Sequence, residues 1–138
     1  MRNWIVRCRI VLQMSKKIFI SFAIEDEYAR DFLVGQAKNN GTPIEFTDMS
    51  VKEAWSDSWK TRCRERIKGC DGVIAILSKK TNNADGAKWE MWCANDENIP
   101  MIGVHIHKDD KGAIPSELGN HKVIEWSWDG IASFINNL

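Results

Sequence analysis

The sequence predicts one α/β domain in which helices cover both faces of a parallel sheet. Short apolar runs, typical of buried strands, alternate along the chain with segments in which apolar residues recur every three or four positions. The chain has 138 residues, enough for one hydrophobic core and too few for two. Apolar residues make up 43% and charged residues 28%, which excludes a disordered chain and a membrane protein.

The first half of the chain predicts two strands and two helices. Residues 17–22 are a nearly continuous apolar run and form the first strand, and residues 43–48 form a second, more polar strand at an edge. A helix over residues 25–39 has an apolar face made of Tyr28, Ala29, Phe32, Leu33 and Ala37. A second helix begins at Ser56 or Asp57, and we expect its Trp59, Cys63 and Ile67 to face the core, with Cys70 continuing the pattern.

The second half predicts three more strands. Residues 72–78 are the most apolar run and should form the central strand, and residues 100–107 and 122–126 form the fourth and fifth strands. A loop over residues 79–86 leads into a helix over residues 87–98. Ile131, Phe134, Ile135 and Leu138 form the apolar face of a closing helix.

Short links and right-handed crossovers then favour a flavodoxin-like three-layer sandwich. Its five parallel strands take the order 2-1-3-4-5, and ligands bind outside the carboxyl ends of such strands. Ser21, Asp48 and Ser78 lie at those ends. Residues 14–138 form the predicted domain, and residues 1–13 are an N-terminal extension, with Met14 as a candidate start.

Charge and cysteine usage point to the cytoplasm. Lys+Arg and Asp+Glu both number 19, which predicts no general attraction to nucleic acid or to an anionic membrane. No apolar run reaches the ~18 residues of a membrane helix. The four cysteines have no CxxC spacing, so we interpret them as reduced thiols.

Most sequence motifs for bound groups are absent. The chain has no GxGxxG, no P-loop and no GxSxG motif. His105 and His107 lie two residues apart near a strand end, but we interpret them as solvated loop residues and predict no metal site. The basic run over residues 60–68 is interpreted as a solvated helix face.

The segment over residues 88–92, KWEMW, starts the helix after the central strand and therefore stands over the carboxyl edge of the sheet. A carboxylate in a first helical turn is stabilised by the helix dipole. From composition alone, Glu90 would be a surface residue, and the rings of Trp89 and Trp92 would belong to the core.

Four segments over residues 17–107 resemble a known family. In order, they are IFISFAIEDEYARDFL, IEFTDMSV, IKGCDGVIAILS and KWEMWCANDENIPMIGVHI. Together they resemble the bacterial TIR-like domains of the Thoeris antiphage family. The resemblance matches the family's Ser-aromatic pair to Ser21 and Phe22, and its Asp-x-Ser to Asp48 and Ser50. Its Trp-Glu pair falls on Trp89 and Glu90, and the family's catalytic role falls on Glu90.

The resemblance implies an enzyme that breaks the bond between nicotinamide and ribose in NAD. NAD is then a substrate, and no cofactor is needed. Phe22, Trp55 and Trp89 are candidates for stacking on the rings of NAD, while Ser21, Asp48 and Ser78 are candidates for hydrogen bonds to sugar or phosphate. The resemblance further implies an ADP-ribose-derived signal, such as a cyclic isomer, that acts on a separate effector protein, and it implies self-association.

Three alternatives stay open. The first alternative is a TIR-type module that binds like domains without catalysis. The second is an enzyme similar to nucleoside deoxyribosyltransferases, in which a glutamate is the nucleophile. The third alternative is a flavin carrier. The absence of a Ser/Thr-rich loop after the first strand argues against it.

Overall fold

The computed structural model describes residues 15–49 and 55–138, and its five strands form one parallel sheet. The strand order is β2-β1-β3-β4-β5, which confirms the predicted flavodoxin-like topology. The strands are short and bounded by polar turns: β1 (Lys16–Ser21), β2 (Ile44–Thr47), β3 (Gly72–Leu77), β4 (Met101–His105) and β5 (Val123–Glu125). All four pairings are parallel.

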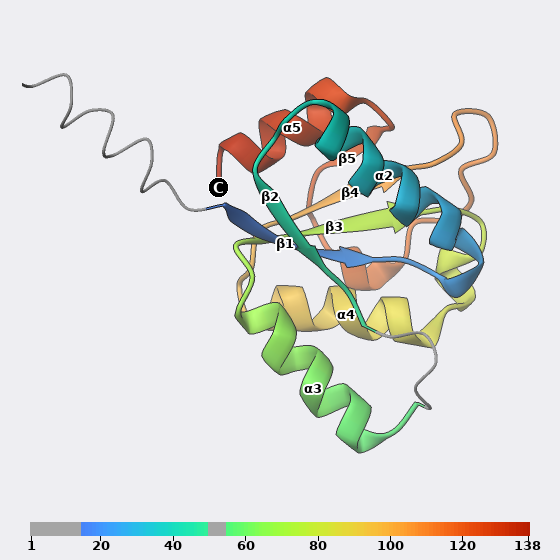
Figure 1. Ribbon diagram of the computed structural model, residues 1–138. Helices are drawn as coiled ribbons and strands as arrows, with labels where there is room; N and C mark the ends of the chain where they lie inside the picture. The colour runs from blue at the N-terminus through green and yellow to red at the C-terminus, as the bar shows by residue number, and fades with distance from the viewer. Residues whose placement is uncertain (1–14, 50–54) are drawn as a thin grey trace, which may run out of the picture.

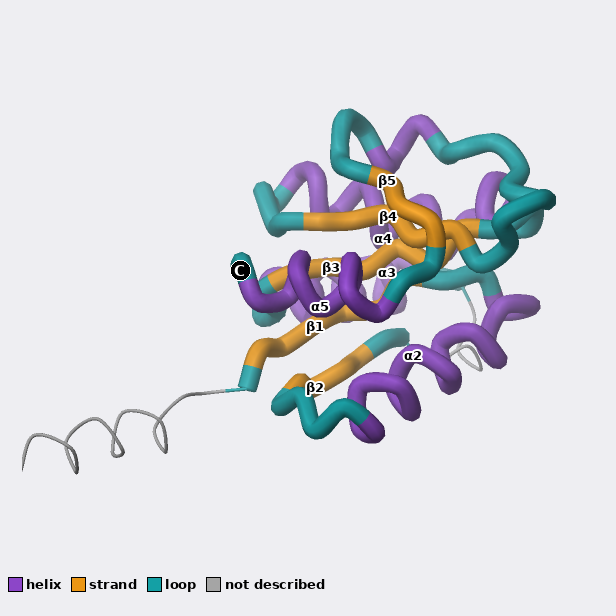
Figure 2. Tube along the Cα trace, turned by 90° about the horizontal axis from the view of Figure 1, so that it is seen from above, coloured by secondary structure: helices purple, strands orange, loops and turns teal. Residues whose placement is uncertain are grey.

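Two helices cover each face of the sheet. Helices α2 (Glu27–Asn39) and α5 (Trp128–Asn136) lie on one face, and α3 (Asp57–Lys68) and α4 (Asp85–Asp96) lie on the other (Figure 1). In Figure 2 the first pair stands in front of the sheet. In the described part of the chain there are also three single turns of 3-10 helix, which the periodicity did not predict: η1 (Ile24–Asp26), η2 (Thr81–Asn83) and η3 (Ser116–Leu118).

The layers enclose two apolar cores, because successive strand residues point to opposite faces. Ile18 and Ile20 pack under α2 and α5, whereas Phe19 packs with α3 and α4. Every residue of β3 is buried, as expected of the central strand. The edge position predicted for residues 43–48 is also confirmed, since β2 is the outermost strand beside β1.

The buried face of α3 is the predicted one, whereas that of α2 is narrower than predicted. Trp59, Cys63 and Ile67 are buried as predicted, and the Ser56 hydroxyl accepts the Trp59 backbone N–H at 3.1 Å, which caps α3. On α2, however, Tyr28 and Phe32 are exposed rather than in the core. Ala29, Leu33 and Ala37 recur every four residues and already form the buried stripe, which turns the two aromatic rings outward.

Two further predictions are corrected at strand and helix ends. Helix α4 begins at Asp85, so the loop predicted over residues 79–86 is shorter, and Glu90 lies in the second helical turn rather than the first. His105 is the last residue of β4 and is buried, so the interpretation of His105 as a solvated loop residue is wrong.

The structure also bears on metal sites, cysteines and membrane spans. Within residues 15–49 and 55–138, no three His, Cys, Asp or Glu side chains gather as a metal site. Cys63, Cys70 and Cys93 are free and buried, and Cys8 lies outside the described residues. No helix in the described part of the chain has the length and apolar character of a membrane span.

Candidate active site

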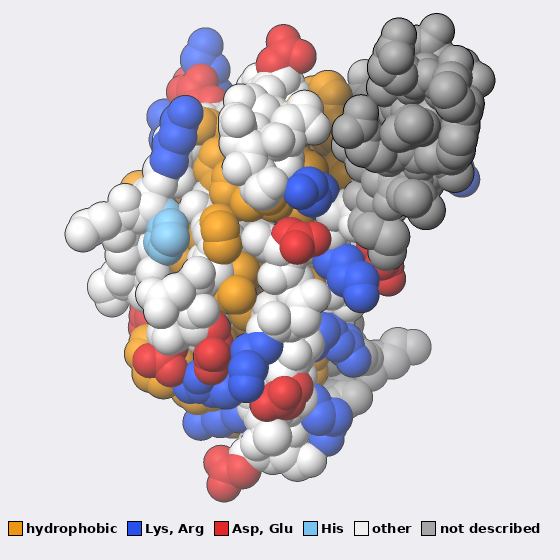
Figure 3. All heavy atoms as spheres, turned by 90° about the vertical axis from the view of Figure 1, so that its left-hand side faces the viewer, with side chains coloured by type: hydrophobic (Ala, Val, Ile, Leu, Met, Phe, Trp, Pro, Cys, Tyr) orange, Lys and Arg blue, Asp and Glu red, His pale blue; other side chains and the backbone are white. Residues whose placement is uncertain are grey.

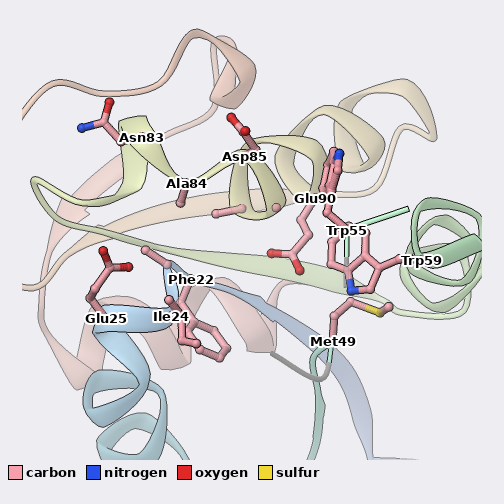
Figure 4. A pocket seen from close by; sticks show the side chains of 13 residues that line it. Phe22, Ile24, Glu25, Met49, Trp55, Trp59, Asn83, Ala84, Asp85 and Glu90 are labelled. Atoms are coloured by element: carbon pink, nitrogen blue, oxygen red, sulfur yellow. The ribbon is translucent and has the colours of Figure 1, made fainter. Parts of the chain in front are cut away.

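A pocket of about 320 Å³ lies at the carboxyl ends of β1, β2 and β3. Phe22 to Glu25 follow β1, Met49 follows β2, and Asn83 to Ala87 lie between β3 and the first turn of α4. Trp55, Trp59 and Glu90 complete the lining (Figure 4). The predicted strand order requires this meeting, because β1 lies between β2 and β3.

We consider this pocket the candidate site because of its chemical groups and not because of its size. A hollow of about 390 Å³ lies at the other end of the strands, between the start of β4 and α5. Figure 3 shows the side of the molecule at that end, where hydrophobic side chains lie among Lys, Arg, Asp and Glu. The side chains that line this hollow include no carboxylate, thiol or imidazole, and the largest of them are Met101, Ile102, Phe134 and Leu138. The Glu90 pocket holds the groups that could act on a substrate.

Glu90 is the buried acid of the pocket. Its side chain is 5% exposed, and its carboxylate points into the space between Phe22 and the rings of Trp55 and Trp59 (Figure 4). The Ser21 hydroxyl donates to Glu90 Oε1 at 2.8 Å. The prediction that Glu90 lies in a cleft near Ser21 is confirmed, and the expectation of a surface residue is wrong.

Burial dominates the electrostatics of Glu90. It raises the pKa of Glu90 to about 8, the Ser21 hydrogen bond lowers that pKa, and the negative charge of Asp48 raises it. The carboxyl group is therefore mostly protonated at neutral pH. Ser21 has one hydroxyl proton and two acceptors in reach, Glu90 Oε1 and the Ala87 carbonyl oxygen at 3.2 Å. The hydroxyl can thus accept from neutral Glu90 or donate to ionised Glu90.

Aromatic and acidic side chains form the rest of the wall. Phe22 is buried, with the Arg30 guanidinium 5.4 Å from its ring centroid. The Trp55 and Trp59 rings lie 5.0 Å apart between centroids. Glu25 and Asp85, both exposed, also line the pocket, and their negative charge favours a cationic ligand.

Of the predicted site residues that the structure describes, four are not in the lining of this pocket: Ser21, Asp48, Ser78 and Trp89. Ser21 reaches the pocket only through its hydrogen bond to Glu90. Asp48 pairs with Arg30 at 2.5 Å. Ser78 donates to Asp26 at 2.5 Å and accepts the Lys80 backbone N–H, which orders the turn after β3. Trp89 lies over a neighbouring hollow, with its ring stacked on Trp92. Ser50 lies outside the described residues.

Other residues that line the pocket were not predicted from the sequence. Met49 directly follows Asp48, and Glu25 follows the end of the first strand by four residues. Their position just after a strand end could have predicted them, because ligands bind there in this fold class. Trp59 was predicted as core and is buried, but it also lines the pocket. Helical periodicity cannot show that a core residue borders a cavity.

Comparisons with known proteins show the family and the fold of this chain. The sequence pattern of a family described as "Thoeris protein ThsB, TIR-like domain" matches residues 19–111. Among solved structures, the crystal structure of a prokaryotic SEFIR domain has a TM-score of 0.55 at 15% sequence identity, over 89% of each chain, which shows a shared fold. No curated protein matches significantly. The chain therefore belongs to the family of TIR-like domains of the Thoeris protein ThsB, which gives it a TIR-type role in defence.

Proposed function

We propose that this chain cleaves the bond between nicotinamide and ribose in NAD, with Glu90 as the catalytic carboxylate. The observation that carries the proposal is a buried carboxyl group that faces a pocket at the strand ends. Among the described residues, its hydrogen-bond partner is a neutral hydroxyl, and no lysine or arginine pairs with it. An acid in this setting is available to a cationic substrate.

The chemistry requires one carboxylate. The nicotinamide ring of NAD is a cation, and when the bond from its nitrogen to ribose C1′ breaks, the electron pair leaves with the ring. The leaving group is then neutral and needs no proton, whereas the ribosyl group is left with positive charge. Ionised Glu90 stabilises that charge, as carboxylates do for oxocarbenium-like transition states.

The wall of the pocket supports the same substrate. Glu25 and Asp85 attract the nicotinamide cation, and the rings of Phe22 and Trp55 offer stacking surfaces. A bound cation also favours the ionised form of Glu90, because opposite charge lowers the pKa of a carboxyl group. Substrate binding thus helps to ionise the group that the reaction needs.

The proposed product is an ADP-ribose derivative that carries a signal. Water at ribose C1′ gives linear ADP-ribose, and attack by a nucleophile of the same molecule gives a cyclic isomer. We propose that this product acts on a separate effector protein in the cytoplasm during phage infection. Product analysis by mass spectrometry separates the linear from the cyclic outcome, which differ by one water.

Glu90→Gln is the decisive variant. The amide keeps the shape and cannot carry the charge, so nicotinamide release should fall by roughly 10² to 10³. Glu65→Gln, an exposed change on α3, is the matched control and should leave the rate unchanged. The comparison uses phage-infected cells or concentrated protein in which the wild type is active. Equal release by wild type and Glu90→Gln would contradict the assignment, and cleavage of deoxynucleosides instead of NAD would favour the deoxyribosyltransferase alternative.

A non-catalytic interaction module is the second candidate. The observation that favours it is a stripe of exposed apolar residues spaced every four positions, Ile24 in η1 and Tyr28 and Phe32 on α2. Such a stripe is typical of an interaction surface. A Tyr28→Ser variant should then shift the sedimentation coefficient of concentrated protein toward that of a monomer. If the wild type assembles but releases no nicotinamide under any condition, this candidate replaces the enzyme.

A further inference from the structure

A second hollow of about 320 Å³ adjoins the Glu90 pocket. It is lined by Trp55, Asp85, Lys88, Trp89, Trp92 and Glu117. Trp55 and Asp85 line both spaces, so the two hollows share one wall. A molecule longer than the first pocket can therefore continue past Trp55 into the second hollow.

Three tryptophans give the second hollow the character of a stacking site. Trp89 and Trp92 stack with centroids 4.9 Å apart and planes at 21°. Trp55 and Trp92 are 47% and 41% exposed, so part of each ring is open to a ligand. Exposed aromatic rings gathered at a hollow are typical of a ligand surface, and aromatic rings bind nucleic-acid bases by stacking.

The second hollow offers cations that the first lacks. The Glu90 pocket is lined by three acidic residues, Glu25, Asp85 and Glu90, and by no lysine or arginine, which disfavours a pyrophosphate there. Asp85 and Glu117 line the second hollow, but lysines accompany them. Beyond Trp55, the Lys60 ammonium lies 4.7 Å from the Trp55 ring and 5.2 Å from the Trp89 ring, and Lys88 lines the hollow. Within residues 15–49 and 55–138, neither lysine forms an ion pair.

This distribution of charges fits NAD, the proposed substrate. Its cationic nicotinamide end belongs in the acidic pocket, and its phosphates belong beside Lys60 and Lys88. Its adenine ring then reaches the tryptophans, where the carboxylates of Asp85 and Glu117 can accept the hydrogens of the exocyclic amino group.

We propose that the hollow lined by Trp55, Trp89 and Trp92 binds the adenine-nucleotide half of the substrate. This inference rests on the proposed function, because it assigns the other half of the same substrate to the Glu90 pocket. It makes Trp92 a specificity-determining residue, since Trp92 lines the second hollow and not the first.

Binding of AMP tests the hollow without any reaction. Isothermal titration calorimetry measures AMP binding to the wild type, to Trp92→Ala and to Ile114→Ala, an exposed apolar control. A lost stacking contact is worth ~1–3 kcal/mol, so Trp92→Ala should weaken binding about fivefold or more. Ile114→Ala should bind AMP like the wild type. No binding to the wild type, or equal binding by Trp92→Ala, overturns the inference.

A kinetic comparison then separates this inference from the proposed function. Nicotinamide release is measured from NAD and from nicotinamide mononucleotide, which lacks the adenylate half. Trp92→Ala should reduce kcat/KM for NAD about tenfold more than for the mononucleotide. Equal losses on both substrates contradict the inference while leaving the proposed reaction standing. Trp92-dependent AMP binding by a protein that releases no nicotinamide contradicts the reaction and supports the nucleotide hollow.

Discussion

Glu90 is an acid whose environment opposes its own charged form. Burial raises its pKa to about 8, and the single hydrogen bond from Ser21 compensates for only part of the lost hydration. The proposed reaction nevertheless needs the carboxylate. The pKa of one side chain therefore links the activity and the stability of this protein to pH.

The first residue-scale prediction concerns the pH dependence of the rate. The ionised fraction of Glu90 rises as pH approaches and passes its pKa of about 8. We therefore expect kcat/KM for nicotinamide release to increase tenfold per pH unit below that pKa and to level off above it. The measurement is a pH–rate profile, with Glu90→Gln as the background for uncatalysed NAD breakdown at high pH. A rate that falls with rising pH over this range would contradict the role of Glu90.

The second residue-scale prediction concerns the stability of the fold. Between the unfolded pKa near 4.5 and the folded pKa of about 8, the native state binds more protons than the unfolded state. The free energy of unfolding should fall as pH rises through this window. Glu90→Gln removes the titration, so it should be more stable than wild type above pH 8, by on the order of a few kcal/mol, and similar near pH 4.

Urea denaturation of both proteins at several pH values measures this difference. Glu65→Gln is again the control, because an exposed carboxylate is not desolvated by folding. If the free-energy difference between wild type and Glu90→Gln is the same at acid and alkaline pH, then Glu90 is not held protonated by burial.

At the scale of elements, the site depends on where helices begin. The sequence predicts the phase of α3 correctly, because Trp59, Cys63 and Ile67 are apolar at four-residue spacing. It places the start of α4 two residues too late, because Asp85 and Gly86 have the composition of a loop. Gly86 nevertheless belongs to the first turn of α4 and packs against Trp59, whose ring lies 3.6 Å from the place where a Cβ would stand, an ordinary van der Waals distance.

Strand β4 gives an element-scale prediction. A Cβ atom at Gly103 would lie 2.9 Å from Leu77 and 3.0 Å from Leu118, both fully packed. Gly103→Ala should therefore lower the free energy of unfolding by ~1–3 kcal/mol. Gly35→Ala is the matched change, since nothing lies within 4 Å of its Cβ in α2, and it should raise that free energy by up to ~1 kcal/mol. Chemical denaturation measures both, and a neutral Gly103→Ala would show that β4 can shift.

On the scale of the whole molecule, the sheet order is what assembles the site. β1 lies between β2 and β3, so segments that follow three separate strands meet at one edge. Glu90 and Ser21 are 69 positions apart in the sequence and share a hydrogen bond. Ligand binding at such a junction should stabilise the whole domain, because the contacts exist only when the fold is complete.

Thermal unfolding with ADP-ribose tests this linkage. At a free concentration one hundred times its Kd, a ligand that binds only the native state adds ~2.7 kcal/mol to the free energy of unfolding. We expect Tm to rise with ADP-ribose concentration, and to stay constant with ribose alone. A Tm that does not move at millimolar ADP-ribose would contradict a site for this half of NAD.

The sequence by itself determined the strand and helix order, the neighbours of each strand and the meeting of Ser21 with Glu90. These follow from local periodicity and from crossover handedness, which act over short stretches of chain. Only the tertiary structure decided that Glu90 is buried, that Asp48 and Ser78 have partners outside the pocket, and that Trp55 stands between two hollows. Burial and charge environment are set jointly by segments distant in sequence, so no local pattern carries them.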